Sequence, residues 1–169
     1  QREIKLEITG LPNKSRCEEI LNDTEVIPET TACMMFDLNN LKIVNDTKGH
    51  SAGDQLILNF AQLLRKVIPE EDFVGRYGGD EFLMMGTCPD EKMAESIKDM
   101  IQNAIDEYNR SNVMPVPLAV SIGYILTPVN DRKSDIDDYI RQADSMMYQI
   151  KQRRKKEQKE REECEKTSI

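Results

Sequence analysis

The tetrapeptide Gly78-Gly79-Asp80-Glu81 restricts the fold of this chain more than any other feature. Segments suited to β-strands flank it, residues 73–77 before and residues 82–85 after. Two glycines between such segments predict a short hairpin, because tight hairpin turns often need φ > 0. We therefore predict a hairpin over residues 73–85 whose tip carries two acids. If the extended period of two persists there, the acids point to opposite sides.

A second acidic segment follows the apolar run of residues 31–36, which ends at Asp37. Such a run predicts a buried strand with the carboxylate at its end. Mg²⁺ binds one or two carboxylates together with substrate phosphates, so a strand-end acid beside an acidic hairpin predicts a metal site. Palm-type nucleotidyl transferases use this arrangement. The alternative is a hairpin tip kept soluble by its charge, since turns attract Gly and Asp for conformational reasons.

The sequence of residues 76–82 resembles the signature of GGDEF domains, the diguanylate cyclases that join two GTP molecules into cyclic di-GMP and release two pyrophosphates. Four more segments resemble family motifs and occur in the family's order: residues 9–13, 36–54, 121–123 and 143–151. The resemblance extends from about residue 6 to residue 155 and implies an Mg²⁺-dependent cyclase.

The resemblance also implies an α+β fold, a ferredoxin-like palm with a central, mainly antiparallel sheet covered by helices and the signature on a β-hairpin. Apolar periodicity predicts the helices and the remaining strands: helices over 14–22, 51–67, 89–109 and 135–155, and strands over 31–38 and 116–126. We expect residues 1–6 to end an upstream linker helix, residues 7–155 to form the GGDEF domain, and residues 156–169 to form a charged tail.

The resemblance assigns the metal and the chemistry to two segments. Asp37, Asp80, Glu81 and the carbonyl of Leu38 are the expected ligands of Mg²⁺, with Mn²⁺ as an alternative ion. Asp80 and Glu81 are the expected catalytic acids, and the sequence does not divide their roles.

The remaining positions that match the family are expected to bind GTP. Asn45 and Asp54 would recognise guanine, although Asn45 also suits a turn and Asp54 a helix N-terminus. Aspartate at position 54 favours GTP over ATP. The triphosphate would be held by backbone N–H groups and by lysines: Asn40, Leu41, Lys42, Lys151 and Lys155.

Several positions depart from the family pattern. Lys155 stands where arginine is usual, and Arg154 replaces a usual glycine. Pro69 replaces the arginine of the family's product-inhibition site, which predicts weak or absent feedback binding there. The departures at Asn39, Asn40 and Lys155 support an alternative hypothesis, in which the chain is a catalytically silent GTP-binding regulatory module.

Composition limits the partners. The net charge is −8, with +3 in residues 151–169, which argues against nucleic-acid binding by the rest of the domain. No apolar stretch approaches the roughly 20 residues that span a bilayer, so we expect no membrane contact by this segment. The four cysteines are widely spaced, which favours reduced thiols in the cytoplasm. The sequence leaves open whether the full-length protein has a membrane anchor elsewhere.

The expected reaction adds further partners. Cyclic di-GMP is two-fold symmetric and one site holds one GTP, so a second copy of the domain must face the first. The family resemblance also implies an upstream sensory or receiver domain.

Overall fold

A four-stranded antiparallel sheet forms the centre of the computed structural model, which describes residues 8–22, 31–111, 116–127 and 136–168. The strand order is β2-β3-β1-β4, and every neighbouring pair is antiparallel. The strands are β1 (Thr31–Leu38), β2 (Phe73–Arg76), β3 (Glu81–Thr87) and β4 (Val120–Leu126). The helices are α1 (Lys14–Asn22), α2 (Leu41–Lys48), α3 (His50–Val67), α4 (Glu91–Arg110) and α5 (Ile136–Thr167). The predicted α+β class is confirmed.

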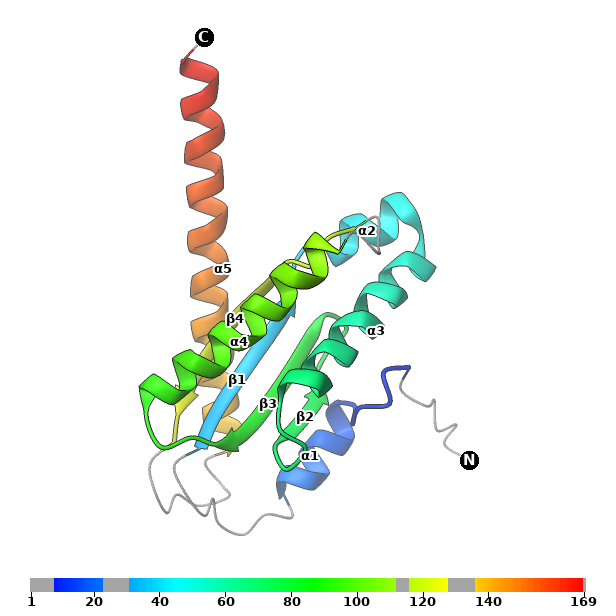
Figure 1. Cartoon of the computed structure of the whole chain (residues 1–169), viewed down its shortest axis with the longest axis vertical. Helices are drawn as coiled ribbons and strands as arrows, with labels where there is room; N and C mark the ends of the chain where they lie inside the picture. The colour runs from blue at the N-terminus through cyan, green and yellow to red at the C-terminus, as the bar shows by residue number, and fades with distance from the viewer. Residues whose placement is uncertain (1–7, 23–30, 112–115, 128–135, 169) are drawn as a thin grey trace.

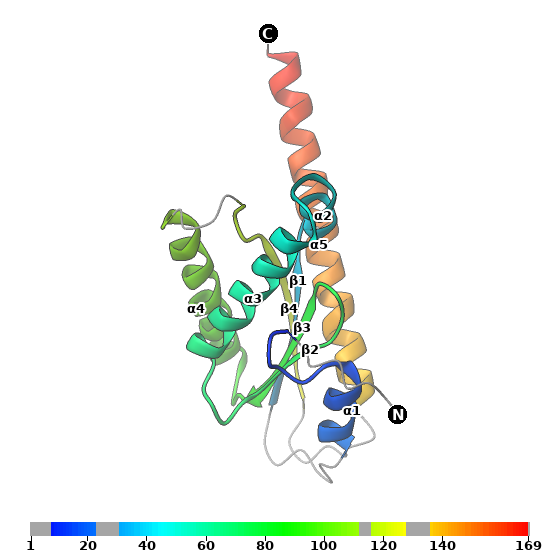
Figure 2. The same ribbon diagram turned by 90° about the vertical axis from the view of Figure 1, so that its right-hand side faces the viewer.

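Helices cover both faces of the sheet, with α3 and α4 on one face and α5 on the other (Figures 1 and 2). Alternate residues of β1 enter the two cores, because successive side chains of a strand point to opposite faces. Phe36 packs edge-on against Phe60 of α3, with ring centroids 5.9 Å apart. Met35 lies in the other core, with Met147 of α5. Asp37 has the parity of Met35, so it belongs to the α5 face.

Two elements, β4 and α5, differ from the predicted ranges by more than two residues at one end. The strand predicted to begin at Val116 begins at Val120. The side chain of Asn109 accepts from the N–H of Leu118 at 2.8 Å and donates to its carbonyl at 2.9 Å, which uses the groups that would extend the strand. Helix α5 continues past residue 155 to Thr167, and its C-terminal part extends beyond the sheet (Figure 1).

The predicted set of helices is incomplete, because residues 41–48 form helix α2. Asn40 precedes it with a left-handed backbone, φ 65°. The prediction of positive φ in the Gly-Gly turn is also wrong, since neither Gly78 nor Gly79 adopts it. Four residues separate β2 from β3, so the chain reverses without a two-residue turn.

The described helices include none that is both long and apolar enough to cross a bilayer. The predicted linker segment at residues 1–6 lies outside the described residues.

Candidate active site

The sheet register brings the predicted metal acids together. Asp37 on β1 lies directly opposite Glu81 at the start of β3. The N–H of Leu38 donates to the carbonyl of Asp80 at 2.8 Å, which ties the end of β1 to the hairpin. Asp37 is buried, with 6% of its surface exposed. Backbone pairing therefore places three acidic residues at one end of two adjacent strands.

Lys151 of α5 forms an ion pair with Asp37, and the Nζ to Oδ2 distance is 2.5 Å. Lys151 was predicted from the sequence to bind the triphosphate. Its ion pair with Asp37, a predicted metal ligand, was not predicted. The other oxygen of Asp37, Oδ1, is buried and has no hydrogen-bond partner among the described residues. Burial raises the pKa of Asp37, and nearby Asp80 raises it further against the opposing effect of Lys151.

Glu81 is in a similarly unfavourable environment for its charge. Burial raises its pKa, and repulsion from Asp144, Asp37 and Asp80 adds to this while Lys14 opposes it. Partly buried carboxylates that repel one another are stabilised by a nearby cation, so these acids suit a metal ion. Within the described part of the chain, no group of three or more His, Cys, Asp or Glu side chains could hold a metal alone. The donor set fits Mg²⁺ completed by substrate phosphates, with Oδ1 of Asp37 as an available ligand.

Neutralising Glu81 is expected to stabilise the metal-free protein. A carboxyl whose pKa is raised on folding binds more protons in the folded state, so its contribution falls as pH rises through that pKa. Glu81→Gln should therefore raise Tm by a few degrees at pH 7 in EDTA, and the gain should shrink toward pH 4. Thermal unfolding from pH 4 to pH 8 measures this, with exposed Glu70→Gln as the control. An unchanged or lower Tm at pH 7 would contradict the charge repulsion.

A cavity of about 410 Å³ adjoins these acids. Its walls come from the turn between β1 and α2, from Asp80 and from one side of α5. It contains seven residues predicted to bind substrate or metal through side chain or backbone: Leu38, Asn40, Leu41, Lys42, Asp80, Lys151 and Lys155. The first N–H groups of a helix have no intrahelical partner and favour anions. The start of α2 therefore adds backbone donors to the lysines.

A second cavity, of about 520 Å³, lies on the other side of Lys151. Asp37, Glu81 and Asp144 line it, together with Lys151 and Lys155. Asp80 lines only the first of these two cavities and Glu81 only the second. The predicted opposite directions of the two acids agree with this division.

The predicted guanine residues lie on consecutive helices, Asn45 on α2 and Asp54 on α3, and neither lines the 410 Å³ cavity. The side chain of Asn45 packs against Gly53, where an added Cβ would lie 1.8 Å from its Oδ1. Asp54 follows Gly53 and is exposed. Gly53 therefore lets Asn45 lie close to the helix turn that carries Asp54.

Arg76 shapes the hairpin tip, a role that the sequence analysis missed. Its Nη2 donates to the carbonyl of Gly79 at 2.8 Å and its Nε to that of Gly78 at 3.2 Å. The N–H of Tyr77 donates to the carbonyl of Glu81 at 2.8 Å. The sequence signal for this role was the arginine two residues before the Gly-Gly pair. Glycine carbonyls are easily reached by a donor, because glycine has no side chain to cover them.

A family comparison agrees with this geometry. The model of the family described as "Diguanylate cyclase, GGDEF domain" matches residues 7–157. The chain belongs to the GGDEF domain family. The resemblance inferred from the motifs is thus confirmed.

Relatives of this GGDEF domain include signalling proteins and cyclases. The signaling protein YkoW of Bacillus subtilis is 31% identical over 158 residues, which cover 88% of this chain and 19% of YkoW. The diguanylate cyclase DgcP of Escherichia coli is 29% identical, over 88% of this chain and 45% of DgcP. The solved GGDEF domain of PA1120 from Pseudomonas aeruginosa matches with a TM-score of 0.68 and 28% identity, over 87% of this chain and 88% of that one. The chain thus spans less than half of either full-length relative.

Proposed function

We propose that this GGDEF domain is a diguanylate cyclase that condenses two GTP into cyclic di-GMP and two pyrophosphates. The observation that carries the proposal is the buried Oδ1 of Asp37, which has no hydrogen-bond partner among the described residues. Asp37 lies beside Asp80 and Glu81 and lines the 520 Å³ cavity together with Lys151 and Lys155. A site with this charge pattern suits a divalent cation and a triphosphate together. GTP is the proposed substrate because Asn45 and Asp54 offer the acceptors and donors that guanine needs.

The proposed roles follow the placement of each residue. Asp37, Asp80, Glu81 and the Leu38 carbonyl would hold Mg²⁺, or Mn²⁺ in its place. When bound, the ion would polarise the α-phosphate and lower the pKa of the attacking 3′-hydroxyl. Asp80 is the proposed acceptor of the hydroxyl proton, because it is the signature acid that lines the cavity beside the phosphate-binding turn.

The triphosphate would lie against the start of α2 and the lysines of the cavity. Lys42 lies on the first turn of α2, while Lys151 and Lys155 lie one turn apart on α5. These charges would offset the negative phosphates, as P-loop lysines do. When GTP and the ion bind, Lys151 would exchange part of its contact with Asp37 for a contact with the phosphate. Asp37 would then bind the ion.

Reaction requires two copies, since one site holds one GTP and the product joins two. We therefore expect cyclic di-GMP formation per protein molecule to rise with protein concentration. Fusing the domain to a dimerising helix should raise the rate at low concentration, because an intramolecular encounter replaces a bimolecular one. Product formation measured over a range of protein concentrations tests this. A rate per molecule that stays constant for the unfused domain would contradict the shared site.

The second candidate is a GTP-binding regulatory module without turnover. The observation that favours it is the contact between Lys151 and Asp37, because an ammonium group already occupies one oxygen of the metal acid. Asn39, at a position where the family often has aspartate, instead donates from its amide to Ser121 Oγ at 3.2 Å. Binding of GTP without product in the fused dimer would select this candidate.

The setting in the full-length protein is also a proposal. We place the domain in the cytoplasm, where GTP is available, and expect an upstream sensory or receiver domain to control its pairing. The boundaries predicted for the domain, residues 7–155, and for the charged tail, residues 156–169, stay predictions.

A further inference from the structure

One face of α5 forms a wall of the 410 Å³ cavity. The residues on this wall have the helical spacing i, i+3, i+4, i+7: Lys151, Arg154, Lys155 and Gln158. Side chains at these spacings lie on the same face of a helix. Because α5 continues to Thr167 without a break, all four residues stand on regular helix.

Arg154 is the one arginine among the described residues that line this cavity. Its Nη1 donates to the carbonyl of Val120, the first residue of β4, at 3.0 Å. This contact fixes one side of the guanidinium against the sheet. A guanidinium has five N–H donors, and the structure gives Arg154 no ion pair with a described carboxylate. The remaining donors are thus available to an anion in the cavity.

We infer that Arg154 binds the triphosphate through the planar fork of its guanidinium, an inference that rests on the proposed function. An arginine fork matches phosphate oxygens in pairs, whereas a lysine acts as a point charge. Lys155 therefore supplies charge but no fork. Arg154 lies one residue earlier on the same helix face and borders the same cavity, so it supplies the paired contact that Lys155 does not.

The inference predicts a loss that is specific to the triphosphate. Arg154→Lys keeps the charge and allows a hydrogen bond to the Val120 carbonyl, but it removes the fork. We expect this variant to bind guanosine 5′-(α,β-methylene)triphosphate with Mg²⁺ about tenfold more weakly than the parent. Binding of GMP should change by less than about twofold. Isothermal titration calorimetry of the whole chain measures both.

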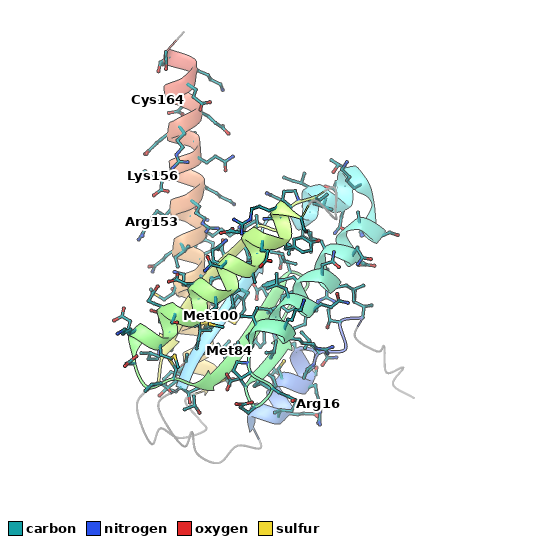
Figure 3. All side chains as sticks on the ribbon, viewed as in Figure 1. Arg16, Met84, Met100, Arg153, Lys156 and Cys164 are labelled. Carbon is teal, nitrogen blue, oxygen red and sulfur yellow. The ribbon has the colours of Figure 1, made fainter. Side chains whose placement is uncertain are left out.

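The matched control is Arg153→Lys, the same change one residue away. Arg153 is exposed on α5 (Figure 3) and does not line the cavity. This control should bind both ligands as the parent does, and thermal unfolding should show that both variants are folded. Equal analogue binding by parent and Arg154→Lys would overturn the inference. An equal loss for GMP and the analogue would also overturn it, because it would indicate a structural role through Val120.

The same titration separates this inference from the proposed function. A parent that binds neither ligand would overturn the proposed GTP site and the role of Arg154 together. A parent that binds the analogue but makes no cyclic di-GMP would overturn the cyclase proposal alone. In that case a triphosphate-specific loss in Arg154→Lys would still support the arginine contact.

Discussion

Replacing Asp37 with asparagine is expected to reduce cyclic di-GMP formation by about 1,000-fold or more, because removing a metal ligand forfeits several kcal/mol of transition-state stabilisation. The variant keeps the shape of the side chain but removes the negative charge. It therefore loses the proposed metal contact and the ion pair with Lys151 at the same time. Product quantified by chromatography after incubation of the fused dimer with GTP and Mg²⁺ measures the effect.

The matched control for this loss is Asp99→Asn, on the exposed surface of α4, which covers the opposite face of the sheet from α5. It should retain parental activity. Thermal unfolding should be used to check that Asp37→Asn is folded, because the substitution keeps the shape of the side chain but leaves Lys151 without its ion-pair partner. Activity within about tenfold of the parent would contradict the role of Asp37 as a metal ligand.

Gly123→Ala is expected to cause the largest loss of stability. Gly123 lies on β4 where α5 crosses it, and an added Cβ would lie 2.2 Å from the backbone nitrogen of Met147 and 2.5 Å from its Cα. A backbone atom cannot move aside as a flexible side chain can, so α5 would have to shift from the sheet. We expect the free energy of unfolding to fall by about 3 kcal/mol or more. Urea denaturation measures this.

Gly79→Ala provides the control, since a Cβ there meets no atom within 4 Å and Gly79 lacks positive φ. Its free energy of unfolding should stay within about 0.5 kcal/mol of the parent. If Gly123→Ala unfolds at the same urea concentration as this control, the close contact between β4 and α5 is wrong.

Strand β1 illustrates what the sequence could predict. Its apolar run ends at Asp37 and Leu38, and the structure has the strand over Thr31–Leu38 as predicted. A strand that is buried on both faces can be recognised in the sequence as a continuous apolar run, because both faces require apolar side chains. The acidic hairpin was predictable for a related reason, since its flanking segments are strand-like.

Features that depend on distant contacts were not predictable from local patterns. The start of β4 is set by the side chain of Asn109, from another element. The pairing of Lys151 with Asp37 joins residues 114 positions apart. Helix α2 is only eight residues long, with a single buried residue, Val44, so its apolar periodicity was too weak to detect.

The most direct test of the cyclase proposal is the product made from GTP and Mg²⁺ by the domain fused to a dimerising helix, identified by mass spectrometry beside its Asp80→Ala variant. We expect cyclic di-GMP from the parent and none from Asp80→Ala. GTP binding without cyclic di-GMP from the parent dimer would contradict the proposal and identify a regulatory GTP-binding module.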